Sequence, residues 1–229
     1  MNPAETMTLN SRRTGINLSG ARAGDISLAF LLLLFALGNF WRAFEDRGID
    51  SWMNTGDRLA SVLVLCVGAV LFLIRRPAKG RAEGIFPRII AIAGTWMIMP
   101  AISMPQTWNA EWYLGFSAVG LTLGSGFVIW SLLTLRRNFS IFPEARSLVR
   151  TGPYGIVRHP LYATYAWMYV LMLVSRISVL AVVVTGVAIG CEVWRAHYEE
   201  RVLRKAFPDY DEYASVTPRF IPKFLTPFR

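Results

Sequence analysis

Charged side chains and cysteines are both scarce in this sequence. Only 17% of the 229 residues are Asp, Glu, Lys or Arg, against about a quarter in typical soluble domains. The two cysteines, Cys66 and Cys191, lie in apolar stretches, which excludes a disulfide framework and a cysteine-based metal motif. The sequence also lacks internal repeats, low-complexity segments and any stretch typical of a separate soluble domain. These absences leave a chain dominated by apolar residues, with the cysteines expected in its core.

Apolar residues make up 54% of the chain and gather in runs almost free of charge, at 26–41, 59–74, 89–104, 113–135 and 161–193. A membrane-spanning helix needs roughly 20 apolar residues, with about 17 tolerated. A soluble helix needs a polar face at helical spacing, which Leu28–Leu37 lacks. The pattern predicts an all-α, polytopic transmembrane helical bundle of about five to six spans. Leu161–Val174 and Val179–Val193 would form a C-terminal hairpin of two short helices, followed by an amphipathic cytoplasmic tail.

The basic residues follow the positive-inside rule. With the N-terminus inside, 20 of the 24 lie on one side of the bilayer: three before the first span, five after the second, five after the fourth and seven in the tail. This predicts cytoplasmic N- and C-termini and an even number of crossings. The net charge of +9 therefore indicates topology and lipid contact, with no nucleic-acid partner expected. No small-residue cleavage site follows the first run, which predicts a signal anchor.

The chain divides into a cytoplasmic segment at 1–25, a four-helix transmembrane region at 26–135 and a C-terminal region at 136–229. Asp25 or Ser27 is placed to cap the first span. Gly120 and Gly124 are spaced to let two helices approach closely in lipid. The C-terminal part from Asp209, rich in aromatic, proline and basic residues, is expected to lie on the lipid headgroups.

One polar cluster covers residues 148–162 and includes Gly152-Pro153-Tyr154 and Arg158-His159-Pro160. Proline suits the first position of a helix and keeps the preceding residue out of the α region. His159 should therefore stand extended at the mouth of a helix beginning at Pro160, where free N–H groups favour anions. The Gly152-Pro153 turn would bring Tyr154 over the same place. A juxtamembrane turn with an interfacial arginine and tyrosine belt explains the same residues.

The second cluster, Glu192 to Arg204, continues directly from an apolar helix and contains adjacent Glu199 and Glu200. A carboxylate near the membrane surface is well placed to hold an ammonium group. Ordinary i,i+4 ion pairs, Arg195 with Glu199 and Glu200 with Arg204, explain the same pattern. Together the two clusters supply an anion site, paired carboxylates, a histidine and aromatic rings. A cofactor that is both zwitterionic and cationic, such as S-adenosylmethionine, suits this set, because aromatic faces stabilise cations. No metal site is expected.

These motifs resemble a known family. Gly152-Pro153-Tyr154 with Arg158-His159-Pro160-x-Tyr162 resembles the first signature of the isoprenylcysteine carboxyl methyltransferase and phospholipid methyltransferase superfamily. Its second signature is similar to Glu199-Glu200-x-x-Leu203 through Phe207-Pro208, Tyr210 and Tyr213 to Arg219-Phe220-Ile221-Pro222. The resemblance covers about 135–222 in the same order and spacing.

The resemblance implies a membrane-embedded, S-adenosylmethionine-dependent methyltransferase whose cofactor lies in a cytoplasm-facing pocket within 136–229. Glu199 and Glu200 would hold the amino-acid end of the cofactor, and which of them makes the contact stays open. Arg204 and Arg219 would serve the acceptor side, with Glu200 as the third candidate catalytic residue. The implied cofactor-binding residues are Gly152, Tyr154, Arg158, His159, Pro160, Tyr162, His197, Glu199 and Glu200.

The acceptor is expected to be lipophilic and to enter from the bilayer of a bacterial inner membrane or an equivalent membrane. The motifs resemble the isoprenylcysteine branch more closely. A phosphatidylethanolamine amine or a small thiol stays open, and an amine acceptor needs a base, for which His159, His197 or a glutamate is available. Two other classes remain: an NADPH-dependent sterol-type membrane reductase and a non-enzymatic membrane scaffold.

Overall fold

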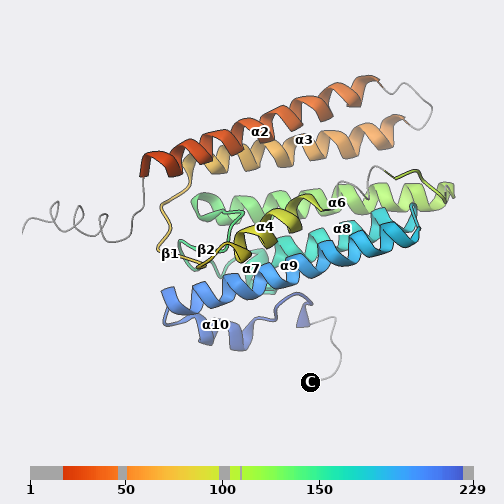
Figure 1. Ribbon diagram of the computed structural model, residues 1–229. Helices are drawn as coiled ribbons and strands as arrows, with labels where there is room; N and C mark the ends of the chain where they lie inside the picture. The colour runs from red at the N-terminus through yellow and green to blue at the C-terminus, as the bar shows by residue number, and fades with distance from the viewer. Residues whose placement is uncertain (1–17, 46–50, 98–103, 109, 224–229) are drawn as a thin grey trace, which may run out of the picture.

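The computed structural model describes residues 18–45, 51–97, 104–108 and 110–223, and their regular structure is almost entirely helical (Figure 1). This confirms the predicted all-α class. The longer helices are α2 (Leu18–Glu45), α3 (Ser51–Ile74), α4 (Phe86–Trp96), α6 (Glu111–Leu135), α8 (Pro160–Val174) and α9 (Val179–Ala206). The short elements are β1 (Gly80–Arg81), the 3-10 turn η1 (Arg136–Asn138), β2 (Glu144–Ala145), α7 (Pro153–Ile156) and α10 (Tyr210–Val216).

The six longer helices pack as neighbours in a bundle. Helix α2 packs on α3, α3 on α6, α6 on α8 and α8 on α9, while α4 covers another part of α9 (Figure 1). Outward-facing side chains on α2 are large and apolar: Ile26, Leu37 and Trp41 are each more than half exposed. An apolar surface of this kind suits contact with lipid tails.

Three described helical segments, Arg22–Ala43, Glu111–Asn138 and Val179–Ala206, are long and apolar enough to cross a membrane. The apolar stretches Arg58–Ile74 and Pro160–Val174 are shorter. The chain is therefore a membrane protein, as predicted. The third apolar run contains the short helix α4, and its residues 98–103 lie outside the described part of the chain.

The C-terminal hairpin agrees with the prediction. Helix α8 is short, as expected, and α9 continues without a break from Val179 through the polar cluster to Ala206, as the direct continuation of the cluster from an apolar helix predicts. Ser178 caps α9, and its Oγ accepts a hydrogen bond from the Ala181 N–H. One rigid helix thus connects the apolar interior to Glu199 and Glu200, so their orientation is set by the packing of the whole helix.

The predicted cap of the first span is wrong. Helix α2 already includes Leu18, so part of the predicted segment 1–25 is helical, and Asp25 and Ser27 lie inside this helix. Ser27 donates to the Ala23 carbonyl one turn earlier. Asp25 instead accepts hydrogen bonds from Arg75, at the far end of α3. Because the helix begins before the apolar run, Asp25 is not at its end and cannot cap it. Its carboxylate binds the distant Arg75 instead.

The prediction for the glycines of α6 is confirmed by its packing on α8. A Cβ at Gly120 would lie 2.7 Å from Leu171 Cδ1, and one at Gly124 would lie 3.1 Å from Met168 Cγ. Both distances are shorter than ordinary carbon contacts, so an alanine at either position would force the facing Leu171 or Met168 side chain to shift.

The loops that carry the clustered basic residues gather at one end of the bundle (Figure 1). Strands β1 and β2 pair there in antiparallel register, Gly80 opposite Ala145. At the opposite end, the Thr107 N–H donates to the Ser175 carbonyl at 2.9 Å. The basic loops therefore lie at one end of the bundle and the Thr107 loop lies at the other, as the distribution of basic residues predicts. Which compartment each end faces stays a prediction.

Candidate active site

The segment that leads into α8 depends on a glycine. Gly152 has φ +58° and precedes the single turn α7. A Cβ at this position would lie 3.2 Å from Thr134 Oγ1 of α6. Only glycine adopts this backbone conformation without strain, and the close approach to α6 leaves little room for a side chain. Gly152 therefore supports the site through the backbone.

His159 stands at the mouth of α8, as Pro160 predicts. Its φ of −126° and ψ of 65° lie outside the α region, and the buried Pro160 is the first residue of the helix. The imidazole is 5% exposed. It stacks on Tyr162, with centroids 5.4 Å apart and planes 11° apart, and lies 5.7 Å from the Phe220 ring. The ring is thus enclosed by aromatic side chains from α8 and the C-terminal tail.

The tail folds back onto this segment, which corrects the expectation that it spreads over the headgroups. The Arg158 N–H donates to the Pro218 carbonyl at 2.8 Å, and the His159 N–H donates to the Arg219 carbonyl at 3.1 Å. Tyr213 of α10 is buried and donates to the Tyr154 carbonyl at 2.6 Å. Aromatic burial and backbone pairing hold the tail against protein.

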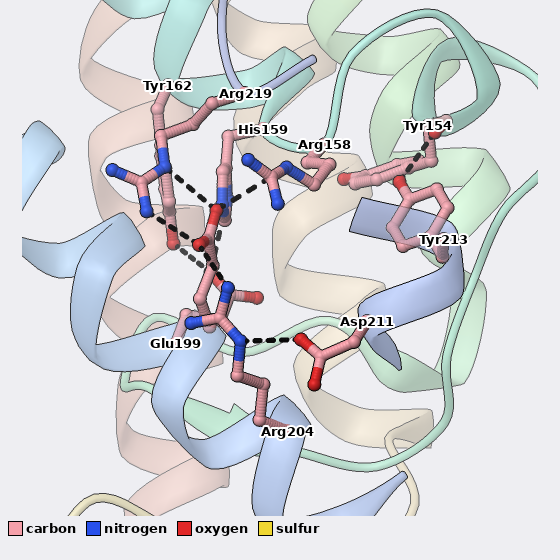
Figure 2. Close-up of polar contacts among 10 residues, drawn as sticks. Tyr154, Arg158, His159, Tyr162, Glu199, Arg204, Asp211, Tyr213 and Arg219 are labelled. Carbon is pink, nitrogen blue, oxygen red and sulfur yellow. Dashed lines mark hydrogen bonds and ion pairs between the residues drawn. The ribbon is translucent and has the colours of Figure 1, made fainter. Parts of the chain in front are cut away.

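Glu200 is the centre of a charged cluster, and its partners His159, Arg204 and Arg219 are labelled in Figure 2. Its side chain is 0% exposed. Arg219 binds both carboxylate oxygens, with Nε 2.9 Å from Oε1 and Nη2 2.6 Å from Oε2. His159 Nε2 lies 3.1 Å from Oε1, and Arg158 and Arg204 lie 3.6 and 3.8 Å away. A carboxylate offers about four acceptor positions, and three hydrogen bonds and two longer ion pairs use most of this capacity in Glu200.

Glu199 has a different environment although it is adjacent in sequence. Its side chain is 30% exposed. The Tyr162 hydroxyl donates to Oε2 at 2.7 Å, and His159 Nδ1 lies 3.9 Å from the same oxygen. Among the described contacts, no hydrogen bond reaches the other oxygen, Oε1. Glu199 thus keeps acceptor capacity that Glu200 has lost.

Two ionisable groups of the tail are held in one protonation state. The hydrogen bonds that Arg219 makes to Glu200 raise the pKa of the guanidinium above its usual value, so the cation persists. Burial raises the pKa of Tyr213 to about 12. Its hydroxyl therefore stays protonated and continues to donate to Tyr154 near neutral pH.

The alternative explanation of the second cluster by i,i+4 pairs holds in part. Arg204 pairs with Glu200 and also donates to Asp211 at 2.8 Å. Arg195, however, pairs with Glu192 one turn earlier, at 3.5 Å, and its guanidinium lies over the Tyr162 ring at 4.8 Å. The expected pair of Arg195 with Glu199 is absent among the described ion pairs.

The structure brings most of the predicted site residues together. Arg158, His159, Tyr162, Glu199, Glu200, Arg204 and Arg219 form one connected cluster (Figure 2). Tyr154 lies beside the cluster and anchors Tyr213 through its carbonyl. His197 is partly buried and makes a ring contact with Tyr198 at 6.3 Å. None of the described hydrogen bonds or ion pairs joins His197 to the cluster.

Sequence reasoning left out three side chains that surround the cluster: Arg195 over Tyr162, Asp211 on Arg204, and Phe220 beside His159. Phe220 lies in the second motif, which was a usable signal. No signal in the sequence indicated that Asp211 and Arg195 would contact the cluster, because their partners depend on how α9 and the tail pack. In the described part of the chain, no group of three or more His, Cys, Asp or Glu side chains is arranged to hold a metal ion.

The part of the chain that carries most of the charged cluster is similar to a methyltransferase family. Residues 112–210 match the family model described as phospholipid methyltransferase. This part of the chain, which contains the first motif and most of the second, is similar to the isoprenylcysteine and phospholipid methyltransferase superfamily, in agreement with the resemblance of the motifs.

Two curated proteins are similar to this chain. The nickel-cobalt-cadmium resistance protein NccN of Alcaligenes xylosoxydans xylosoxydans is 28% identical over 149 residues, which are 64% of this chain and 66% of that protein. The cobalt-zinc-cadmium resistance protein CzcN of Cupriavidus metallidurans is 31% identical over 121 residues, 51% of this chain and 52% of that protein. The similarity thus spans between half and two thirds of each relative.

Proposed function

We propose that this protein is an integral membrane methyltransferase that uses S-adenosylmethionine and methylates a lipophilic acceptor entering from the bilayer. The family match supports methyl transfer as the reaction class. The observation that carries the cofactor assignment is the contrast between the two glutamates. Glu199 has one carboxylate oxygen without a hydrogen bond from the described residues, at the edge of a buried cluster, whereas both oxygens of Glu200 accept hydrogen bonds within it.

This contrast divides the work between the two carboxylates. We assign Glu199 to the α-ammonium group of the cofactor, because an ammonium needs an accessible carboxylate with unused acceptor positions. Glu200 acts as a positioning residue. It draws Arg219 from the tail, Arg158 from the segment before α8, and His159 onto one face of α9.

The surrounding side chains fit the rest of such a cofactor. Arg158 Nε is buried and lies 3.6 Å from Glu200 Oε1, an ion pair too long for a hydrogen bond, and it has no hydrogen-bond partner among the described residues. An unpaired buried donor is costly, and the α-carboxylate of the cofactor would supply its missing acceptor. The rings of Tyr162, His159 and Phe220 are stacked or tilted against one another. Tyr162 already has the Arg195 guanidinium over its ring, so we assign Phe220 as the aromatic ring that would stabilise the sulfonium through cation–π attraction.

When bound, S-adenosylmethionine supplies an electrophilic methyl group. The protein contributes orientation, removal of water and a place for the proton. A carboxylate or thiolate acceptor attacks without a base at this step. An amine acceptor requires one. His159 donates from Nε2 to the Glu200 carboxylate, so in the neutral ring the Nδ1 lone pair is free on the side of Glu199 and can accept that proton.

For the acceptor we favour the isoprenylcysteine-carboxyl type, on the combined motif pattern. A phospholipid amine is the alternative, and the two differ in their need for His159 Nδ1. Turnover with a prenylcysteine analogue should survive His159→Gln better than turnover with phosphatidylethanolamine. Equal losses of turnover with both acceptors would contradict a role of His159 Nδ1 that is specific to the amine acceptor.

The decisive experiment is calorimetry of the detergent-purified chain with S-adenosylmethionine, S-adenosylhomocysteine and NADPH. We expect saturable binding of the first two. Binding of NADPH alone would support the sterol-type reductase, and binding of none would support a non-enzymatic scaffold. A Tyr198→Phe variant, altered on α9 at a side chain that belongs to the Phe86 and His197 contacts, serves as a control that should bind normally.

A contribution to metal resistance is a second candidate, favoured by the similarity to two proteins named for resistance to cobalt, cadmium and other metals. It is compatible with methyl transfer if the methylated product serves resistance. Growth of a deletion strain on cobalt and cadmium, complemented with the wild type or with Glu199→Gln, tests this. Rescue by the wild type alone would link resistance to the methyltransferase site, and no rescue by either would reject the candidate.

A further inference from the structure

A second charged site lies at the β1–β2 pair, which contributes Arg81 and Glu144 to its lining. It surrounds a cavity of about 270 Å³. The charged side chains in its lining are Arg75, Arg81, Arg88, Asp25 and Glu144, contributed by α2, α4 and the loops that carry β1 and β2. Leu28, Phe142 and Pro143 add apolar surface to the same wall.

Both acidic residues of this cavity are already neutralised. Asp25 accepts hydrogen bonds from Arg75. Glu144 is 7% exposed at its side chain, lies 2.9 Å from Arg81 Nε and 2.5 Å from Arg146 Nη2, and accepts from Ser140 at 2.9 Å. The acidic groups therefore bind side chains of the protein and leave a surplus of positive charge.

Two donors of this region lack a partner. Arg88 is exposed and makes no side-chain hydrogen bond or ion pair with the described residues. Arg146 lies behind the lining residue Glu144, to which it is paired; its side chain is 2% exposed, and its Nε lacks a hydrogen-bond partner among the described residues. Guanidinium groups match the geometry of phosphate oxygens, and an unpaired cation beside buried, preformed ion pairs is a ready anion site.

The surroundings of Arg88 favour an anion that is part of a lipid. Ile85, Phe86 and Ile89 adjoin Arg88 in sequence at the start of α4, and each is at least half exposed. Apolar side chains beside a basic cavity allow acyl chains and headgroup to bind together. A small soluble phosphate would gain nothing from that apolar flank.

We propose that this cavity binds the phosphate of a membrane phospholipid, with Arg88 as its principal ligand and Arg81 as a second. The site is separate from the Glu199–Glu200 cluster and does not depend on methyl transfer. Ser140 connects the two regions: its hydroxyl donates to Glu144 and its carbonyl accepts from Arg195 at 3.5 Å.

The test measures binding of dihexanoyl phosphatidylglycerol, a soluble short-chain lipid, to the detergent-purified full chain by calorimetry. Arg88→Gln removes a charge-assisted hydrogen bond and should weaken binding about 10- to 150-fold. Arg76→Gln is the matched control, because Arg76 is exposed, lies in the same basic loop and does not line the cavity. If Arg76 contributes only a nonspecific surface attraction of about 1 kcal/mol, its loss should weaken lipid binding roughly fivefold.

A large loss in Arg88→Gln with a loss of fivefold or less in Arg76→Gln supports the site. Equal losses, or no saturable binding to the wild type, would overturn it. Glycerol 3-phosphate separates the two sources of phosphate. If it binds as tightly as the lipid, the assignment to a lipid is wrong and the cavity is a soluble phosphate site. Unchanged melting temperatures of both variants ensure that the comparison reports binding.

Discussion

The adjacent glutamates of α9 allow the same substitution, glutamate to glutamine, to test a different role at each position. Glu199→Gln should weaken S-adenosylmethionine binding and leave the fold intact. The amide oxygen of glutamine still accepts from the Tyr162 hydroxyl, so the 2.7 Å hydrogen bond survives. The lost charge-assisted bond to an ammonium is worth about 1.5–3 kcal/mol. Since the Glu199 side chain is 30% exposed, we expect the lower part of that range, a loss of about 10- to 30-fold in affinity.

Glu200→Gln should do the reverse. Removing one partner of a buried ion pair costs about 3–5 kcal/mol. Arg219 and Arg204 keep 35% and 43% of their side-chain surface exposed, so water can partly solvate them. We therefore expect a cost of about 3 kcal/mol, which for a chain of this size lowers the melting temperature by roughly 6–12 °C.

The assay pairs a thermal melt in detergent with calorimetry of S-adenosylmethionine, on the wild type and both variants. The wild type must bind before the variants are informative, which separates a failure of the cofactor assignment from a failure of the division of roles. The reasoning would be refuted by a Glu200→Gln variant that melts normally but does not bind, or by a Glu199→Gln variant that unfolds.

Three further predictions concern the segment before α8 and the topology. Gly152→Ala should destabilise the chain by about 1–3 kcal/mol, seen as a lower melting temperature; an unchanged melt would mean that the loop readily relaxes. His159→Ala should lower methyl transfer to an amine acceptor by about 100-fold or more in protein that still purifies, whereas Pro160→Ala should lose less because alanine keeps the helix; activity that only tracks folded protein would make His159 structural. Cysteines introduced at Gln106 and Thr151 into a cysteine-free chain should be labelled from opposite sides of the membrane, and labelling from one side would reject the topology.

Much of the local structure was predictable because it depends on near neighbours in the chain. Long apolar runs form helices in lipid, where every backbone group must find its partner within the segment. Pro160 starts α8 and keeps His159 out of the α region, as its ring requires. Gly120 and Gly124 lie at a helix contact because only small residues permit that approach.

The errors arose where a side chain had a choice of partners. Asp25 was expected to cap a helix but binds Arg75, fifty positions away in the sequence. The alternative explanation of the second cluster paired Arg195 with Glu199, but Arg195 pairs with Glu192. In each case several partners are compatible with the spacing, and the packing of distant segments selects one.

The sequence by itself determined the class of the protein: a helical membrane bundle with its basic loops at one end and two motifs of a methyltransferase superfamily. Only the tertiary structure decided which glutamate is free. Glu199 and Glu200 are identical in composition and adjacent on α9, so no local signal separates them. They point in directions about 100° apart around the helix, and the returning tail brings Arg219 onto one of them alone. The different environments of the two carboxylates thus follow from the folding of the tail onto α8 and α9.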